Sequence, residues 1–415
     1  MDFLRPVIRP YPWGTRTAIA ELQGRPVPAP GPEAELWMGA HPSAPSGVGW
    51  TTLDEVIAAA PERALGVDCA GRFGGRLPFL LKVLSAEKAL SIQVHPSRAQ
   101  AQAGYAAENA RGLAADDPAR NYVDDWPKPE LLCALTPFEV AAGLRPPSDA
   151  SALLSALEVD ELKPLAAGLT DPSANLGADL GAALAAILEW PDPRPLVASV
   201  VAACQRLADA GGPHADACAA AVRVAADHPG DIGVVALLLM RHAVLQPGQA
   251  VFMPAGGLHA YLRGTGIELL ANSDNVVRSG LTGKHIDVPE LLKLLDPSVD
   301  VPVLSPRPLA DGIATFDTPA PEFRLYLIDL PASPAPSPPA SASPALASLA
   351  PALALPATGP RVLLCLDGAC TLRAETGQEL DLTRGDSCFI PFADGPIHAT
   401  GQARLIQATP GGAVS

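Results

Sequence analysis

The chain is poor in basic side chains, with 29 Lys and Arg against 44 Asp and Glu in 415 residues, and its formal net charge is −15. Proteins that bind nucleic acid or an anionic membrane surface need an excess of positive charge, so we expect neither partner. The composition still permits a small anionic ligand, because such a ligand needs only a local cluster of cations.

The chain also lacks an apolar run long enough to span a bilayer. Its N-terminus, MDFLRPVIRPYPWG, has neither the basic start nor the apolar core of a signal peptide. The seven cysteines are odd in number and scattered, without the paired spacing of a metal site. We therefore expect free thiols in a reducing cytoplasm.

Proline and glycine are abundant instead, with 46 and 36 residues, and the length exceeds that of one ordinary core. Residues 1–147 have the pattern of short strands and turns. Within them, LPFLLKVLS and ALSIQV are separated by three residues and predict a hairpin, and SRAQAQAGYAAENARG predicts a helix. Residues 148–235 hold several Ala- and Leu-rich segments at helical spacing, with Ser148 or Asp149 as the expected N-cap.

Strand-like segments return in residues 236–305 and again in 306–415. The segment DIGVVALLLMRHAVL stands at the start of this region and is compatible with a continuing helix. Residues from about 331 to 360 are rich in Pro, Ala and Ser and predict a disordered loop or linker.

One spacing occurs twice. Gly248 and Pro254 are six residues apart and precede His259, and Gly385 and Pro391 precede His398 in the same way, with two extra residues before the second histidine. A Gly turn, a strand, a Pro turn and a strand that starts at His is typical of the double-sheet jelly roll of cupins.

The predicted fold is therefore mainly β with an α-helical insertion. Residues 1–147 and 236–305 would form a catalytic cupin domain, residues 148–235 a helical insertion domain, and residues 306–415 a C-terminal, cupin-like β-sandwich. No strand with the pattern Gln-x-His precedes His398, so we expect a C-terminal domain without metal.

The stretch IQVHP places Gln93 and His95 two residues apart, so on a strand their side chains share one face. Alone, this common pattern favours a solvent-exposed polar face. His259, after the small-residue turn MPAGG, and Glu130, after Pro127 and Pro129, add an imidazole and a carboxylate. This donor set suits Zn²⁺ with one open position, although the spacing does not separate Zn²⁺ from Mn²⁺, Fe²⁺ or Co²⁺.

Four cations stand in or beside the same segments, namely Lys82, Lys128, Arg278 and Lys284. Each one taken alone is equally well explained as a solvated surface cation. Lys82 differs because it interrupts an apolar run. Together the four suit a phosphate, which Arg binds bidentately and Lys binds as a point charge.

Five segments together resemble the type I phosphomannose isomerases, in family order and as far as about Asp300. They are PYPWG, ELWMGAHPSAPS, LPFLLKVLSAEKALSIQVHPS, DDWPKPELLCALTPFEVAAGLRP and LQPGQAVFMPAGGLHAYLRGTGIELLANSDNVVRSGLTGKHIDVPELL. The resemblance implies a cytoplasmic, zinc-dependent isomerase with one Zn²⁺ per chain. Such an enzyme interconverts mannose 6-phosphate and fructose 6-phosphate through a cis-enediol(ate), and we expect a monomer.

The same resemblance implies roles for individual residues. It gives the metal ligands as Gln93, His95, Glu130 and His259, the catalytic residues as Arg278, Lys128 and Glu268, and the substrate-binding residues as Lys82, Ser91, Tyr261 and Lys284. Trp37 and Trp126 are assigned to core packing and His41 to a structural turn.

The chain departs from the family pattern at one point. Where the family commonly reads Asn-His-Lys-Pro-Glu, this chain reads Trp126-Pro127-Lys128-Pro129-Glu130, and Pro127 has no acid–base chemistry. Any ring-opening role of that histidine must pass to another group or is not needed. The general base stays open among Lys128, Glu268, Lys284 and a zinc-bound water.

Two other functions are compatible with the same ligands. An Fe²⁺-dependent cupin oxygenase would need no phosphate-binding cations. A zinc cupin that binds a sugar phosphate as a regulatory module would explain the missing histidine, and only turnover would distinguish it from an isomerase.

Overall fold

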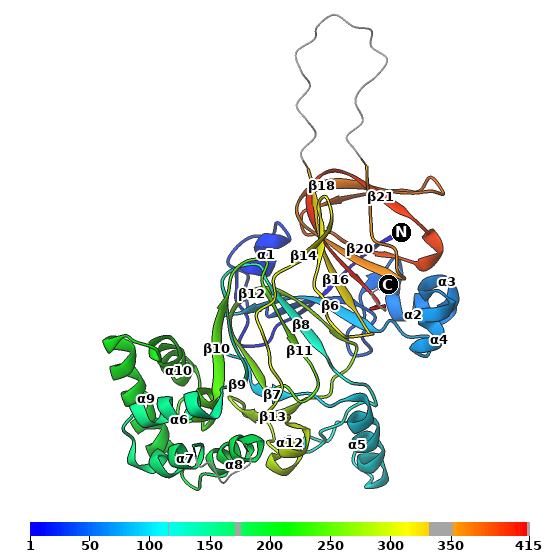
Figure 1. Cartoon of the computed structure of the whole chain (residues 1–415). Helices are drawn as coiled ribbons and strands as arrows, with labels where there is room; N and C mark the ends of the chain where they lie inside the picture. Colours follow the sequence, from blue (N-terminus) through cyan, green and yellow to red (C-terminus); the bar gives the residue numbers. More distant parts are fainter. Residues whose placement is uncertain (115, 171–175, 332–351, 413–415) are drawn as a thin grey trace, which may run out of the picture. The chain divides into compact units, whose positions relative to one another are not determined.

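The computed structural model describes residues 1–114, 116–170, 176–331 and 352–412 (Figure 1). Most of the predicted Pro/Ala/Ser-rich loop lies outside the described residues. The chain forms two compact units. Unit 1 comprises Met1–Leu84, Ile267–Asn272 and Ser305–Ser415, and unit 2 comprises Ser85–Gly266 and Ser273–Leu304. The division into four domain segments at residues 147, 235 and 305 stays a prediction.

Unit 1 contains an antiparallel nine-stranded sheet in the order β1-β20-β18-β21-β16-β15-β14, with β17 on β21 and β19 on β18. Its longest strands, β18 and β21, pair from Val362↔Ala408 to Ala374↔Ile397. The strands are β1 (Asp2–Leu4), β14 (Arg307–Ala310), β15 (Ile313–Thr315), β16 (Arg324–Leu330), β17 (Leu353–Ala354), β18 (Arg361–Ala374), β19 (Glu379–Thr383), β20 (Ser387–Ile390) and β21 (Ile397–Thr409).

The N-terminal part of unit 1 adds a second set of strands, in which β3 pairs with β2 and β6. These strands are β2 (Val7–Arg9), β3 (Glu35–Gly39) and β6 (Phe79–Ala86, of which 79–84 belong to this unit). A small hairpin and short helices complete it: β4 (Gly47–Val48), β5 (Thr51–Thr52), α1 (Ala18–Leu22), α2 (Leu53–Ala59), α3 (Pro61–Leu65), α4 (Val67–Arg72) and η3 (Phe392–Asp394).

In unit 2, strands β7, β8 and β9 pair with β12, and β13, β11 and β10 pair with these three in turn. The strands are β7 (Ile92–Val94), β8 (Glu130–Ala134), β9 (Phe138–Leu144), β10 (Met240–Leu245), β11 (Ala250–Met253), β12 (His259–Ala271, of which 259–266 belong to this unit) and β13 (Val277–Gly280).

The predicted hairpin between the segments that became β6 and β7 is wrong. Strand β7 pairs with β12 and β13 and not with β6. The connecting segment is already bound to β12, because the Leu90 N–H donates to the Tyr261 carbonyl at 2.8 Å. The pairing of β7 with strands distant in the sequence therefore prevails over the hairpin that the short connection would favour.

The predicted helices are present in unit 2. Helix α5 (Arg98–Ala110) begins with a capping box of Ser97 and Gln100. The insertion comprises α6 (Pro147–Ala156), η1 (Asp160–Leu162), α7 (Lys163–Gly168), α8 (Leu176–Leu188), α9 (Pro193–Ala210), α10 (Ala215–Asp227), α11 (Gly233–Ala236) and η2 (Leu237–Leu239), and α12 (Val288–Leu294) follows later. The fold is thus the predicted one, antiparallel sheets with a helical insertion.

Two details of the helix predictions differ from the structure. Helix α6 begins at Pro147 with Pro146 as its N-cap, so Ser148 and Asp149 lie in its first turn and the predicted N-cap is wrong. Proline suits this first position because its N–H would have no helical partner there. The segment DIGVVALLLMRHAVL forms only the short α11 and η2 before it becomes β10.

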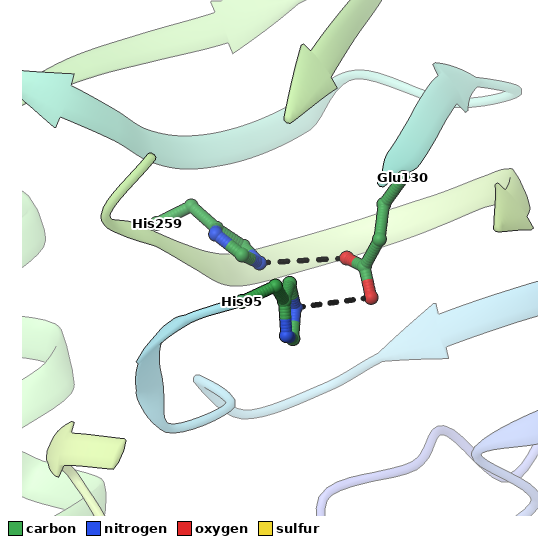
Figure 2. A group of neighbouring side chains, drawn as sticks. All are labelled: His95, Glu130 and His259. Carbon is green, nitrogen blue, oxygen red and sulfur yellow. Dashed lines mark ion pairs between the residues drawn. The ribbon is translucent and has the colours of Figure 1, made fainter. Parts of the chain in front are cut away.

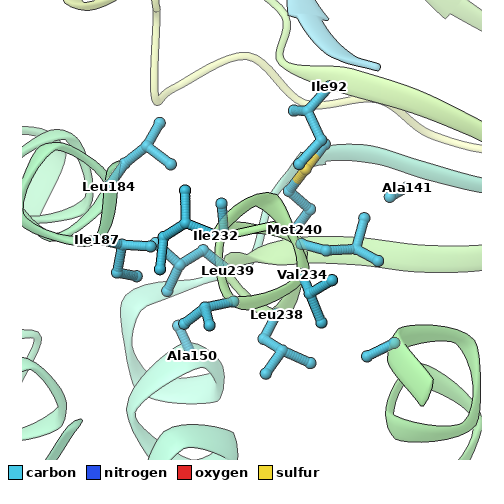
Figure 3. Close-up of a cluster of buried hydrophobic side chains, with 14 of the residues drawn as sticks. Ile92, Ala141, Ala150, Leu184, Ile187, Ile232, Val234, Leu238, Leu239 and Met240 are labelled. Carbon is cyan, nitrogen blue, oxygen red and sulfur yellow. The ribbon is translucent and has the colours of Figure 1, made fainter. Parts of the chain in front are cut away.

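The helical insertion packs against the back of β7. One buried apolar cluster joins Ile92 and Ala141 from the strands to Ala150 of α6 and to Leu184 and Ile187 of α8 (Figure 3). Ile92 and Val94 are fully buried in this cluster. Because side chains alternate along a strand, Gln93 lies on the opposite face of β7 from Ile92 and Val94. The helices therefore fix the strand that bears the predicted ligands.

The repeated spacing corresponds to repeated structure. Gly248 (φ 86°) precedes the four-residue β11 and the thirteen-residue β12, and Gly385 (φ 89°) precedes the four-residue β20 and the thirteen-residue β21. Both glycines have the positive φ that other residues rarely adopt. The predicted repeat is confirmed.

In the part of the chain that the structure describes, no helix has the length and apolar character that a membrane span requires. All seven cysteines are free, as predicted, and all of them are buried.

The close contact of the Gly385 turn with Leu22 can be tested by substitution. A Cβ at Gly385 would lie 2.5 Å from the Leu22 carbonyl oxygen, whereas a Cβ at Gly377, with a similar φ of 86°, would meet nothing within 4 Å. Gly385→Ala should lower the free energy of unfolding by about 3 kcal/mol, because backbone strain and steric overlap add. Gly377→Ala should cost about 1 kcal/mol, from strain alone. Denaturant unfolding measures both, and equal losses would contradict the assigned contact.

Candidate metal centre

Three strands of unit 2 bring two imidazoles and one carboxylate together. His95 directly follows β7, Glu130 is the first residue of β8, and His259 is the first residue of β12. Their ligand atoms all lie within 4.8 Å of one another, and all three side chains are buried (Figure 2). Among the described residues this is the one His/Cys/Asp/Glu group with such spacing.

Glu130 lies between the two histidines. Its Oε1 is 3.2 Å from His95 Nε2 and its Oε2 is 3.4 Å from His259 Nε2, as the dashed lines in Figure 2 mark. His95 Nε2 is buried and makes no hydrogen bond with the described residues. A buried nitrogen lone pair that faces a carboxylate and a second imidazole fits a metal ligand.

The other nitrogen of each ring is held by a backbone carbonyl. His95 Nδ1 is 2.8 Å from the Asn275 carbonyl oxygen, and His259 Nδ1 is 3.0 Å from that of Gly257. Since a carbonyl can only accept, Nδ1 carries the proton in both rings and Nε2 is left as the metal-binding atom. Burial lowers the pKa of His95 to about 4, so this ring is neutral at pH 7.

Glu130 is ionised although it is buried. Burial alone would raise its pKa, but the interactions with His95, Lys128 and His259 hold the pKa well below its usual range. Lys128 Nζ lies 3.4 Å from Glu130 Oε1, and the Tyr261 hydroxyl donates to Oε2 at 3.3 Å. Lys128 and Tyr261 therefore lie beside the carboxylate.

Gln93 occupies the centre of this strand face. It lies opposite His259 in the β7–β12 pair and opposite Arg278 in the β7–β13 pair. Opposite residues in antiparallel strands place their side chains on the same face. Gln93 Nε2 is 3.3 Å from His259 Nε2, and rotation of the amide by half a turn brings its ligating oxygen to that place. The β-strand register thus brings Gln93, His259 and Arg278 together.

Two cations extend this side of the site. Burial lowers the pKa of Arg278, and the charge of Arg278, followed by burial, lowers the pKa of Lys284. The two side chains are therefore close enough to repel each other. Such a pair is stabilised by an anion that binds between or beside them.

Lys82 and Glu268 lie in unit 1 and form an ion pair there. Lys82 Nζ is 2.9 Å from Glu268 Oε2, 3.6 Å from Glu35 Oε1 and 4.9 Å from the ring centroid of Trp37. Trp37 Nε1 donates to Glu35 Oε2 at 2.7 Å. Trp37 is buried as predicted, and it also orients a charged group.

Sequence reasoning missed Glu35 and Asn275. Glu35 stands two residues before Trp37, so the two side chains share one strand face. Trp37 pairs with Lys82, and this pairing, once known, would have indicated Glu35 as a partner of the lysine. Asn275 gave none, because its contact to His95 is made by its backbone. Ser91 is half-buried just before β7, and no hydrogen bond of its hydroxyl is found among the described residues.

Comparison with known proteins gives consistent results along the chain. Residues 2–147 match the model of the catalytic domain of phosphomannose isomerase type I, and residues 360–410 match that of the cupin domain of mannose-6-phosphate isomerase. The chain is 35% identical over 409 residues to mannose-6-phosphate isomerase of Salmonella typhimurium, covering 96% of both chains. It is 36% identical over 407 residues to that of Escherichia coli, again covering 96% of both.

Solved structures agree with these matches. A mutant of phosphomannose isomerase from Salmonella typhimurium superposes with a TM-score of 0.86 at 32% identity, covering 99% of both chains. A crystal structure of mannose 6-phosphate isomerase bound with zinc and yttrium gives a TM-score of 0.85 at 32% identity and the same coverage. Full-length similarity at this level, together with both domain matches, shows that the chain belongs to the type I phosphomannose isomerases.

Proposed function

We propose that this chain is a zinc-dependent isomerase that interconverts mannose 6-phosphate and fructose 6-phosphate in the cytoplasm, with one Zn²⁺ per monomer. The observation that supports this most strongly is the buried group of His95, Glu130 and His259 in a chain of this family. The zinc in a solved relative and the free, buried cysteines are consistent with it.

Four side chains would hold the metal: Gln93, His95, Glu130 and His259. They supply an amide oxygen, two neutral imidazole nitrogens and a carboxylate, a donor set that Zn²⁺ accepts with a position left open. Bound there, Zn²⁺ would supply Lewis-acid stabilisation of the oxyanion that develops when a proton leaves the carbon next to a carbonyl.

The isomerisation moves a proton between C2 and C1 through a cis-enediol(ate), so it needs a proton-transferring group close to both carbons. We assign this role to Lys128, because its Nζ lies beside Glu130 and it is not itself a ligand. Glu268 and Lys284 remain alternatives by their motif positions. Glu268 forms an ion pair with Lys82 in unit 1.

The remaining polar groups are assigned to the substrate. Arg278 is opposite Gln93 in the β7–β13 register, so we assign it to the developing oxyanion. Lys284, next to Arg278, is assigned to the phosphate, which anchors the far end of the sugar, and Lys82 is assigned to substrate binding by its motif position alone. Tyr261 and Ser91 are assigned to substrate hydroxyls, and Tyr261 also orients Glu130 through its hydrogen bond.

The regulatory sugar-phosphate module remains the second candidate, because Pro127 replaces a histidine of the family pattern. The oxygenase is disfavoured by the neighbouring cations Arg278 and Lys284, which its chemistry does not require.

Conversion of mannose 6-phosphate to fructose 6-phosphate by the purified full chain tests the proposal directly. Activity should disappear on treatment with a chelator and return when zinc is added back, because metal-free imidazoles cannot stabilise the oxyanion. A folded, zinc-loaded chain that binds the sugar phosphate without converting it would support the regulatory module instead.

The ligand assignment and the arginine assignment can be separated by two substitutions. His259→Ala should lose both zinc and activity, because it removes a ligand. Arg278→Ala should keep one zinc per chain and lower kcat by about 100- to 1,000-fold, the usual cost of losing one oxyanion donor. Metal analysis and steady-state kinetics provide the measurements. A zinc-replete, fully active His259→Ala variant would exclude His259 as a ligand.

Pro127 provides a third test. If the chain isomerises its substrate with proline at this position, restoring the family histidine by Pro127→His should change kcat/KM by less than about 3-fold. A general acid at this position would instead contribute about 100-fold or more. A gain of that size would mean that the wild-type chain lacks a catalytic group.

A further inference from the structure

Asn275 is fully buried between the polar loop at Ser273 and strand β13, and every polar group of the residue is hydrogen-bonded. Its backbone N–H donates to Ser273 Oγ at 3.2 Å, and its backbone carbonyl accepts from His95 Nδ1 at 2.8 Å. The backbone of Asn275 thus fixes the ring orientation of one candidate ligand.

The side-chain amide of Asn275 binds a different segment, residues 123–126. Its Oδ1 accepts from the N–H groups of Val123 and Asp124 at 2.8 and 3.2 Å. Its Nδ2 donates to the carbonyls of Asp124 and Trp126, both at 2.8 Å, and lies 3.2 Å from Asp124 Oδ1. The amide therefore ties down this segment through both of its polar atoms.

Residues 123–126 lead directly to the second candidate ligand. After Trp126 the chain runs through Pro127, Lys128 and Pro129 to Glu130. Each proline fixes its own φ and restricts the residue before it, so this connection is stiff. A displacement at the Trp126 carbonyl is consequently transmitted to Lys128 and Glu130 and not absorbed by the loop.

The carboxylate of Asp124 links the two segments further. Oδ1 accepts from the Trp126 N–H at 2.9 Å and from the Ser273 hydroxyl at 2.8 Å, and Oδ2 accepts from the Asp274 N–H at 2.9 Å. These bonds hold the 273–275 loop and the 123–126 segment against each other. Asn275 is the member of the network that also contacts a ligand.

We propose that Asn275 is a positioning residue that couples the two halves of the metal centre: its carbonyl orients His95, and its amide sets the position of Lys128 and Glu130. The proposal rests on the proposed zinc-dependent function.

Removal of the amide takes the 2.8 Å acceptor from the Val123 N–H and the 2.8 Å donor from the Trp126 carbonyl, which still accepts from the Ser273 hydroxyl at 3.3 Å, while the backbone bond to His95 can persist. The 123–126 segment must then shift to recover hydrogen bonds, and Glu130 moves with it. Partners that orient metal ligands typically contribute 10- to 100-fold to metal affinity.

The experiment compares zinc affinity and turnover of the full chain in three variants. Asn275→Ala removes the amide, and Asn275→Asp keeps its shape but turns the donor into an acceptor that faces two carbonyls. Asn121→Ala is the matched control. The Asn121 amide lies just before the 123–126 segment and donates to Asp287 Oδ2 at 2.9 Å, away from the ligands. Zinc affinity is measured by titration of the metal-free protein against a chromophoric chelator.

Asn275→Ala and Asn275→Asp should bind zinc about 10- to 100-fold more weakly, and kcat at saturating zinc should fall while KM for mannose 6-phosphate stays within about 3-fold. Asn121→Ala should stay within about 2-fold of wild type in zinc affinity. A purely structural role would lower the melting temperature without changing zinc affinity. Wild-type zinc affinity and kcat in a folded Asn275→Ala variant would overturn the proposal.

If neither Asn275 variant folds, Ser273→Ala decides the question, because it removes only the hydroxyl that links Asp124 to Asn275. It should weaken zinc binding by about 3- to 10-fold, and an unchanged affinity would overturn the proposal. The two hypotheses fail differently. A wild-type chain that binds zinc but does not isomerise refutes the proposed function, whereas the zinc affinities of the variants still decide the role of Asn275.

Discussion

The buried negative charge of Glu130 is the constraint on which the rest of the site depends. A carboxylate with 1% exposure is too costly to leave uncompensated, so the surrounding groups must supply positive charge and hydrogen bonds. The Lys128 ammonium and the Tyr261 hydroxyl do so, while the two imidazoles turn their Nε2 atoms toward the carboxylate. A divalent cation among His95, Glu130 and His259 would compensate the charge further, and it is the simplest reason for such a group in an apolar interior.

The scaffold explains why this group is rigid. Strand β7 has one face packed on the helical insertion through Ile92, while Gln93 on its other face is flanked by His259 and Arg278 through two strand pairings. Backbone carbonyls hold the outer nitrogen of both histidines. His95, Glu130 and His259 therefore come from strand ends, and the carbonyls that orient the two histidines come from the adjoining turns. This arrangement keeps the imidazole lone pairs directed at one point without a metal.

The features of the fold and the site that depend on local sequence pattern could be predicted, whereas those that depend on long-range strand pairing could not. The alternation in IQVHP correctly places Gln93 and His95, and the Gly-Pro-His spacing correctly indicates two similar strand units. The hairpin prediction for β6 and β7 is wrong because β7 pairs with strands that lie more than 150 residues away, and no local pattern encodes that choice. Asn275 was missed for the same reason, since a backbone carbonyl leaves no mark in the sequence. Glu35 needed the β3–β6 register before its partner could be seen.

Stepwise zinc loading of the metal-free chain is the most direct test of the central claim, that the buried group of His95, Glu130 and His259 holds the zinc on which isomerisation depends. The account predicts that isomerase activity rises linearly with bound zinc and stops rising at one equivalent per chain. Full activity in a chain that holds no metal, or one tightly bound zinc that leaves the rate unchanged, would contradict it.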